Sequence, residues 1–116
     1  MREILIALNR EAGIAGSMVI TPDGIMVATA LGSDLEEETV AAFASGLLLG
    51  LKRSLSILRA SGELNSCTLH ASKGRITFFD MKNCYLVVVA DATTKLDGSL
   101  GAIQAAMNKI RNRRVA

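Results

Sequence analysis

Apolar residues recur at helical spacing near both ends of the chain and define one apolar face in each segment. The N-terminal set comprises Ile4, Leu5, Leu8 and Ala12. The C-terminal set comprises Leu96, Leu100, Ile103, Met107 and Ile110. Spacings of three and four residues place each set on one side of an α-helix. We therefore predict a first helix that ends at Gly13 and a last helix over residues 96–114.

Between these two helices, runs rich in β-branched residues predict strands. Residues 16–30, GSMVITPDGIMVATA, have a hairpin pattern in which Pro22 suits the second turn position and Gly24 the fourth. Three further strands are predicted at residues 64–72, 75–81 and 84–91, with tight turns between them. The order α-β-β-α-β-β-β-α predicts a single α+β domain over residues 1–116, an antiparallel sheet with helices on its faces.

The middle of the chain predicts a long helix from about Asp34 to Ala60. Ser33 followed by Glu36 is a capping-box pattern, and the acidic residues around it favour the positive end of the helix dipole. Gly62 is the expected stop.

Within this helix, the segment VAAFASGLLLGL, residues 40–51, carries no charge. The arc expected to lie on the sheet comprises Val40, Phe43, Ala44, Leu47, Leu48, Leu51, Leu55 and Leu58. A second stripe of small residues comprises Ala42, Gly46, Gly50 and Ser54, with Leu49 beside it. Glycine inside a helix costs about 1 kcal/mol relative to alanine. We therefore expect this stripe to lie where another backbone approaches closely.

No other helix of the chain is left to cover the stripe, because the first and last helices each have one apolar face suited to the other side of the sheet. We predict a homodimer in which the same helix of a second copy covers it. The alternative is that the glycines fit against the chain's own sheet. Strand 64–72 supports self-association, because it lacks the charge or proline that usually protects a free edge. The predicted dimer interface comprises Ala42, Gly46, Leu49, Gly50, Ser54, Asn65, Cys67 and Leu69.

Composition limits the possible functions without choosing one. Half of the 116 residues are hydrophobic, which is enough for a core. A net charge of +2 is too small to argue for a nucleic-acid partner. The first residues lack a clean apolar signal-peptide core, and no apolar run approaches the roughly 20 residues of a membrane span. We expect a cytoplasmic protein in which Cys67 and Cys84 are buried, reduced thiols.

No sequence pattern points to catalysis, a metal or a cofactor. His70 is the only histidine, and it has no identifiable nucleophilic partner or second ligand. The glycines of residues 98–101 lack the Lys-Ser/Thr of a phosphate-binding loop. The acidic run 36–38 is interpreted as a solvated helix start. The basic residues of 109–114 are interpreted as a helix end, because no aromatic residue stands among them for base stacking.

The stretches AGIAGSMVITPDGIMVA, GRITFFDMKNCYLVVVAD and LGAIQAAMNKI, together with the acidic-capped long helix, resemble the Roadblock family (the dynein light-chain Roadblock class) in its short bacterial form. The resemblance covers about residues 4–110, and Lys95 departs from it where many members carry Asn. It implies a five-stranded antiparallel sheet with the long helix on one face and the terminal helices on the other, in profilin-like layers. It also implies dimers in which long helices pack together and edge strands join the two sheets.

The resemblance further implies a function, the binding and regulation of a Ras-like small GTPase, for example one that controls polarity or motility. In the predicted dimer, the outward-facing residues of the long helices would form the GTPase-facing platform. Its members are Glu38, Leu49, Lys52, Arg53, Ser56 and Arg59. Arg53, Arg59 and Arg75 are candidates for an arginine that enters the GTPase site. Two alternatives stay open: a structural adaptor without a GTPase partner, and a small-ligand sensor, although no polar cluster faces an obvious pocket.

Overall fold

A computed structural model describes residues 1–32, 35–58, 65–91 and 100–115 and contains three helices and five strands in these residues. The elements are α1 (Arg2–Ala12), β1 (Gly16–Ile20), β2 (Met26–Ala30), α2 (Glu37–Ile57), β3 (Ser66–His70), β4 (Gly74–Asp80), β5 (Tyr85–Asp91) and α3 (Leu100–Val115). The predicted order α-β-β-α-β-β-β-α is confirmed.

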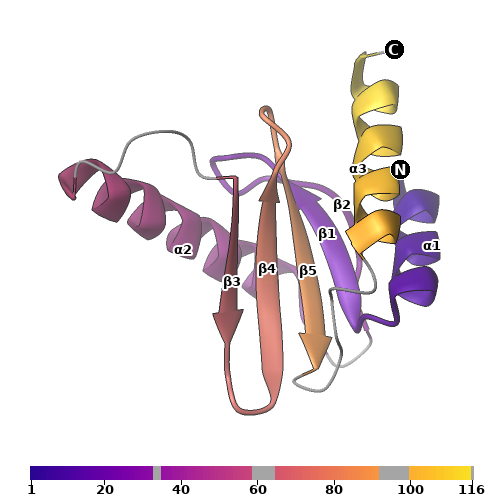
Figure 1. Cartoon of the computed structure of the whole chain (residues 1–116), viewed down its shortest axis with the longest axis horizontal. Helices are drawn as coiled ribbons and strands as arrows, with labels where there is room; N and C mark the ends of the chain where they lie inside the picture. Colours follow the sequence, from indigo (N-terminus) through magenta and orange to yellow (C-terminus); the bar gives the residue numbers. More distant parts are fainter. Residues whose placement is uncertain (33–34, 59–64, 92–99, 116) are drawn as a thin grey trace.

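The strands form one antiparallel sheet in the order β2-β1-β5-β4-β3. The β1–β2 connection turns as expected, because the Gly24 N–H donates to the Thr21 carbonyl at 2.9 Å. Gly24 has a φ of 92°, which glycine adopts without strain. The strands β2 and β3 therefore lie at the two edges of the sheet, far apart from each other (Figure 1).

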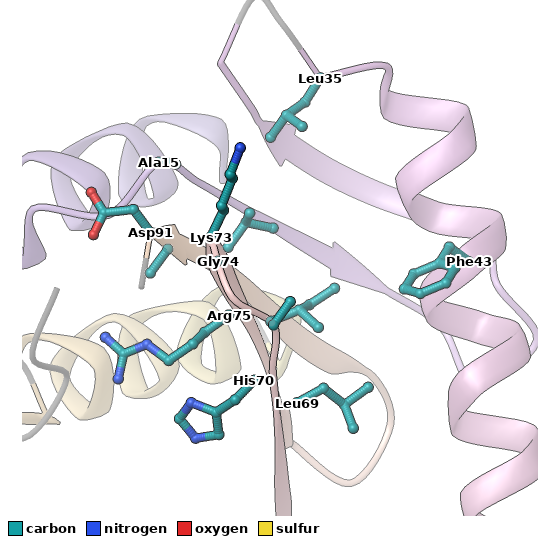
Figure 2. Close-up of a pocket in the computed structure, with 13 residues that line it drawn as sticks. Ala15, Leu35, Phe43, Leu69, His70, Lys73, Gly74, Arg75 and Asp91 are labelled. Atoms are coloured by element: carbon teal, nitrogen blue, oxygen red, sulfur yellow. The ribbon is translucent and has the colours of Figure 1, made fainter. Parts of the chain in front are cut away.

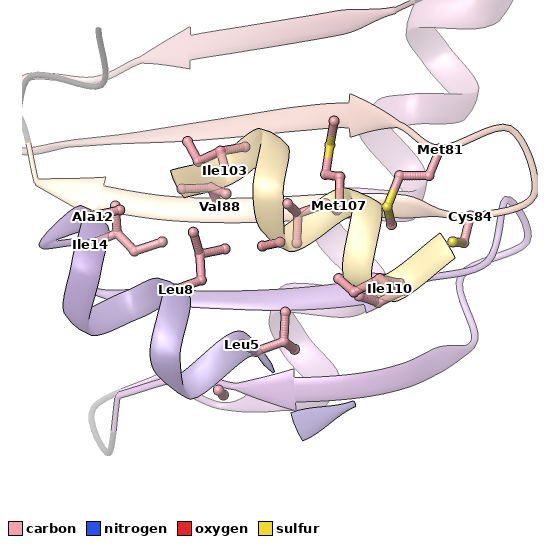
Figure 3. Packing of buried hydrophobic residues seen from close by; sticks show 14 of the residues in the cluster. Leu5, Leu8, Ala12, Ile14, Met81, Cys84, Val88, Ile103, Met107 and Ile110 are labelled. Atoms are coloured by element: carbon pink, nitrogen blue, oxygen red, sulfur yellow. The ribbon is translucent and has the colours of Figure 1, made fainter. Parts of the chain in front are cut away.

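Helices α1 and α3 cover one face of the sheet and make the larger part of the core with it (Figure 3). The apolar faces predicted for these helices are confirmed at Leu5, Leu8, Ala12, Ile103, Met107 and Ile110. Gly13 ends α1 in the left-handed conformation, with φ 65°. Leu100 is half exposed instead of buried, because α3 begins at this residue, and Leu96 lies outside the described residues.

Helix α2 covers the other face, where it packs on Met18, Ile20, Phe78 and Val87. Its contact with the sheet is narrow, since only Ala41, Ala44 and Leu48 of the helix are buried. Figure 1 shows the reason: α2 crosses the sheet obliquely, and its C-terminal end extends beyond β3. Much of the helix therefore has no partner among the described residues.

The limits of α2 differ from those predicted. The helix begins at Glu37, with Glu36 in an extended conformation at the N-cap and without a side-chain capping hydrogen bond. The capping box is therefore wrong, because Glu36 occupies the cap itself and the Leu35 N–H donates to the Gly32 carbonyl in a turn that precedes the helix. The helix ends at Ile57. The predicted Ser33, Asp34, Ala60 and Gly62 lie outside the described residues.

The β2 edge of the sheet is protected by polar side chains of α1. Asn9 Nδ2 donates to the Ala30 carbonyl at 2.8 Å, and Arg2 Nε donates to the Thr29 carbonyl at 3.3 Å. The hydroxyl of the fully buried Ser17 in turn donates to Asn9 Oδ1 at 2.7 Å. Because α1 occupies backbone acceptors of β2, this edge is unavailable for pairing with another chain.

Replacing Asn9 with alanine is expected to destabilise the fold by about 1–3 kcal/mol, because it removes the acceptor that lies 2.7 Å from the buried Ser17 hydroxyl and leaves only the Leu5 carbonyl at 3.5 Å. Urea denaturation followed by circular dichroism measures this loss. The matched control is Asn108→Ala in α3, whose side-chain hydrogen bonds to Gln104 and Arg111 are exposed. Equal midpoints for the two variants would contradict the role given to Asn9.

Candidate protein-interaction surface

The small-residue stripe of α2 faces away from the sheet. Ala42, Gly46, Gly50 and Ser54 are all exposed. A Cβ atom added to Gly46 or Gly50 would meet no atom within 4 Å from the described residues outside the adjoining turns of the helix. The alternative that these glycines fit against the chain's own sheet is therefore wrong, and their small size has no explanation among the described residues.

Large apolar side chains accompany the stripe. Phe43 is 58% exposed and Leu49 59%, while Ile57 and Leu58 at the end of the helix are each 75% exposed. The exposure of Leu49 is as predicted. The placement of Phe43 and Leu58 on the sheet is wrong, because the oblique path of α2 carries both side chains clear of it. An apolar surface of this kind on one helix is typical of a contact with another molecule.

A second correction concerns the membrane. The described residues include one helix, α2, that is long and apolar enough to cross a bilayer by length and composition, although no apolar run was expected to approach that size. This test is weak for a single helix, since helices of soluble proteins also pass it. Insertion of α2 into a bilayer would separate it from Met18, Phe78 and Val87 on the sheet and expose this part of the core.

The β3 edge lies beside this apolar helix and is unprotected. Strand β3 pairs with β4 on one side, and no described residue pairs with its other side. Cys67 and Leu69 point to the α2 face and are half-buried, whereas Asn65 is exposed just before the strand. The strand carries no acidic residue, lysine, arginine or proline. Of the two edges, β3 is thus the one open to another chain.

The residues predicted to face a GTPase differ in their exposure and in their contacts. Glu38, Arg53 and Ser56 are exposed on α2. Lys52 is also exposed, but its Nζ lies 4.9 Å from the centre of the Tyr85 ring, so its charge already contacts the chain's own sheet. Arg59 lies outside the described residues.

Arg75, the third arginine considered for entry into a GTPase site, is placed elsewhere. It alternates along β4 with Ile76, which belongs to the α2 face, and its side chain points away from Phe43 (Figure 2). Its Nε and one terminal nitrogen are buried, and no described residue forms a hydrogen bond with them. Arg75 therefore lies on the opposite face from the platform, which leaves Arg53 as the described candidate.

The structure also has a pocket that the sequence did not indicate. Its volume is about 490 Å³, and it opens between α2 and the end of the sheet formed by the β3–β4 hairpin and the end of β5. Figure 2 shows Phe43 and Leu69 pointing into the space between helix and sheet, while His70 and Arg75 point to the other side. From the sequence, no polar cluster was expected to face an obvious pocket, and this pocket was not predicted. Its lining comes from distant segments, so no local pattern reveals it.

The two cysteines lie in different layers. Cys84 is buried in the core under α1 and α3, whereas Cys67 packs at the edge of the α2 side, and neither sulfur is in a disulfide bond. We expect titration of the denatured, unreduced protein with a thiol reagent to find two free thiols per chain. Finding fewer than two would mean that one thiol is modified or forms a disulfide between chains. Of the two, only the half-buried Cys67 could react in this way without unfolding of the chain.

The described residues offer no metal-binding arrangement. In this part of the chain, no group of three His, Cys, Asp or Glu side chains could hold a metal ion. His70 is exposed at the end of β3, and the acidic residues 36–38 are exposed at the start of α2. The surface that stands out is thus the exposed side of α2 together with the β3 edge.

Comparison with known proteins places this arrangement in a family. The model of the Roadblock/LC7 domain matches residues 2–90. An uncharacterized protein of Methanocaldococcus jannaschii, MJ0714, is 32% identical over 108 residues, which are 93% of this chain and 91% of the relative. The bacterial form expected from the resemblance is not tested by this relative and stays a prediction.

Two solved structures share the fold. The Roadblock/LC7 domain from Streptomyces avermitilis superposes with a TM-score of 0.84 at 16% identity and covers all of this chain and 98% of its own. Myxococcus xanthus MglB superposes with a TM-score of 0.83 at 14% identity over 94% of this chain and 83% of its own. With three helices around a five-stranded antiparallel sheet and a family model that spans most of its length, the chain belongs to the Roadblock/LC7 domain family.

Proposed function

We propose that this protein is a cytoplasmic, homodimeric regulator or scaffold of a Ras-like small GTPase and has no active site of its own. The observation that supports the proposal most strongly is the combination of an apolar, uncovered α2 with an unprotected β3 edge beside it. The proposal that the partner is a GTPase rests on the resemblance to the Roadblock family. The bacterial character expected from that resemblance is part of the proposal.

The proposed dimer forms by antiparallel pairing of β3 with its own copy. Closed two-fold symmetry makes such an interface self-complementary. The strand is open on its outer side and carries no charged residue that would repel its copy. Pairing of the two sheets brings the two α2 helices to the same face, where the exposed Gly46 and Gly50 allow them to approach closely. The residues of the proposed dimer interface are those predicted from the sequence. The centre of the contact lies at Gly46 and Gly50.

The outer sides of the paired helices then form a single platform. Glu38, Arg53 and Ser56 supply its polar groups, and Leu49 supplies an apolar one. Among proteins of this fold, the Thermus thermophilus structure is described as the gliding protein MglB, and another MglB structure has a tetrameric arrangement. These descriptions support a role in assembly and motility for such proteins, and we extend that role to this chain as part of the proposal.

A pull-down with the purified protein tests the function. The bait is a Ras-like GTPase from the same organism, loaded either with GDP or with a non-hydrolysable GTP analogue. We expect the protein to bind one nucleotide state more tightly than the other and to show no GTP hydrolysis alone. Absence of binding in both states would overturn the GTPase proposal and favour the adaptor.

Replacing Arg53 with glutamate is expected to weaken GTPase binding several-fold at low salt without changing the dimer, since Arg53 is exposed on the outer side of α2. The loss should shrink at high salt, because rim charges act mainly through screened long-range attraction. Binding kinetics at two salt concentrations measure both effects. The control is Arg10→Glu, an equal charge reversal on α1 at the other face of the sheet. Equal binding by both variants and the parent would show that the platform lies elsewhere.

A further inference from the structure

The face of the sheet opposite α2 is polar where β3 and β4 form it. Strand alternation places Ser66, Thr68 and His70 of β3 on this face, and all three are exposed. Beside them on β4 lie Thr77, whose hydroxyl oxygen is 3.0 Å from that of Thr68, and Arg75, which is the register partner of His70. These five residues form the β3–β4 polar face, which is open to another molecule on the β3 side.

Arg75 has a hydrogen-bonding edge that the described residues do not use. Its Nε and Nη2 are both buried, and no described residue accepts a hydrogen bond from either. These two nitrogens lie on one edge of the planar guanidinium, at the spacing of the two oxygens of a carboxylate. A buried charged donor without an acceptor is costly, so a bound carboxylate would stabilise this group. The side chain as a whole is half-buried and points to the same side as the exposed His70, so its long stem can turn this edge toward the open face (Figure 2).

The charges around the β3–β4 polar face favour an anionic partner. Lys73 lies in the hairpin turn beside Arg75, and α3, on the same side of the sheet, contains basic residues but no acidic one. Among the residues of β3, β4 and β5, only Asp80 and Asp91 are acidic. Strand alternation places both on the other face, with the residues that pack under α2. An anion bound beside Arg75 would therefore meet no carboxylate of these strands.

We propose that the β3–β4 polar face binds an acidic segment of a partner protein, with one carboxylate held by Nε and Nη2 of Arg75. The exposed hydroxyls of Ser66 and Thr68 and the imidazole of His70 supply further hydrogen bonds along the segment. An open strand surface of this kind suits an extended segment better than a small ion, which binds in an enclosed site. The face lies within one chain and away from α2, so it depends neither on the proposed dimer nor on the GTPase platform. It also stays accessible when the β3 edge pairs, because such pairing uses the backbone.

Fluorescence anisotropy with labelled hexaglutamate at low salt tests this site. We expect the parent protein to bind the peptide and Arg75→Gln to weaken binding about tenfold or more, the loss typical of a hydrogen bond between charged groups. His70→Glu should weaken binding to a similar extent, because it places a carboxylate directly across from Arg75, where it competes with the peptide. His70 is exposed, so this second variant keeps the test valid even if the half-buried Arg75 cannot be replaced without unfolding.

The matched control is Arg10→Gln, at an exposed position near the end of α1. With His70 neutral at pH 7, each of the three substitutions lowers the net charge by one, so general attraction to the basic protein falls equally in all of them. The proposal predicts that Arg10→Gln binds hexaglutamate as tightly as the parent. Equal losses for the variants at positions 10, 70 and 75, or no binding by the parent, would overturn it. Displacement of hexaglutamate by an equal concentration of inorganic phosphate would also overturn it, in favour of a site for small anions.

Discussion

Replacing Gly50 with leucine is expected to convert the protein from dimer to monomer while making the single chain more stable. Within one chain, a Cβ atom at position 50 meets no other described part of the chain within 4 Å, so we expect the monomer to accommodate the side chain. A glycine in a helix interior costs about 1 kcal/mol relative to better helix formers, so the substitution favours α2 itself. Between two chains, the same side chain separates the helices, and overpacking of this kind costs roughly 1–3 kcal/mol.

The substitution should stabilise the single chain but weaken the dimer, and these opposite effects make the prediction specific. Sedimentation velocity over a concentration series should show a dissociation constant raised about 5- to 150-fold, which corresponds to that cost. The control is Gly101→Leu in α3, another exposed helical glycine with nothing within 4 Å, which should leave association unchanged. Unaltered association of the Gly50 variant would show that the small-residue stripe lies outside the dimer contact.

A second large effect is expected from two adjacent leucines. Leu48 is 1% exposed against the sheet, whereas Leu49 is 59% exposed. Leu48→Ala should lower the free energy of unfolding by about 2–5 kcal/mol, because it leaves a cavity in the narrow contact that holds α2 on the sheet. That loss is a large part of the roughly 5–15 kcal/mol that stabilises a domain of this size.

Leu49→Ala should leave the stability of the single chain within about 0.5 kcal/mol of the parent. Its effect should instead appear in binding to the partner GTPase, since Leu49 is the apolar member of the platform. Urea denaturation at low protein concentration, where a dimer contributes least, measures the stability, and a binding assay with the GTPase measures the second quantity. Comparable losses of stability at low concentration for both variants would contradict the orientation of α2.

Much of the fold is predictable from local patterns. The faces of α1 and α3 follow from the spacing of residues such as Leu5, Leu8 and Ile103, which are buried as expected. The β1–β2 turn follows from Gly24, because its positive φ requires a residue that glycine satisfies best. Such features depend only on residues that are close together in the sequence. The local sequence is therefore sufficient to predict them.

The placement of α2 depends on distant contacts and is predicted only in part. A helical wheel identifies the apolar side of the helix, but it contains no information on the crossing angle with the sheet. The wheel therefore places Phe43 and Leu58 in the core, although the oblique path of α2 exposes both. The pocket escapes prediction for the same reason, since Leu69, Ile76 and Val89 converge only after the sheet has formed.

The uncovered side of α2 is the feature that the proposed dimer explains, and the mass of the protein in solution tests it most directly. Size-exclusion chromatography coupled to light scattering should give twice the 12.3 kDa of one chain at micromolar concentration. A mass of 12.3 kDa that stays constant up to the highest soluble concentration would contradict the dimer, and the surface of α2 would then require a different partner.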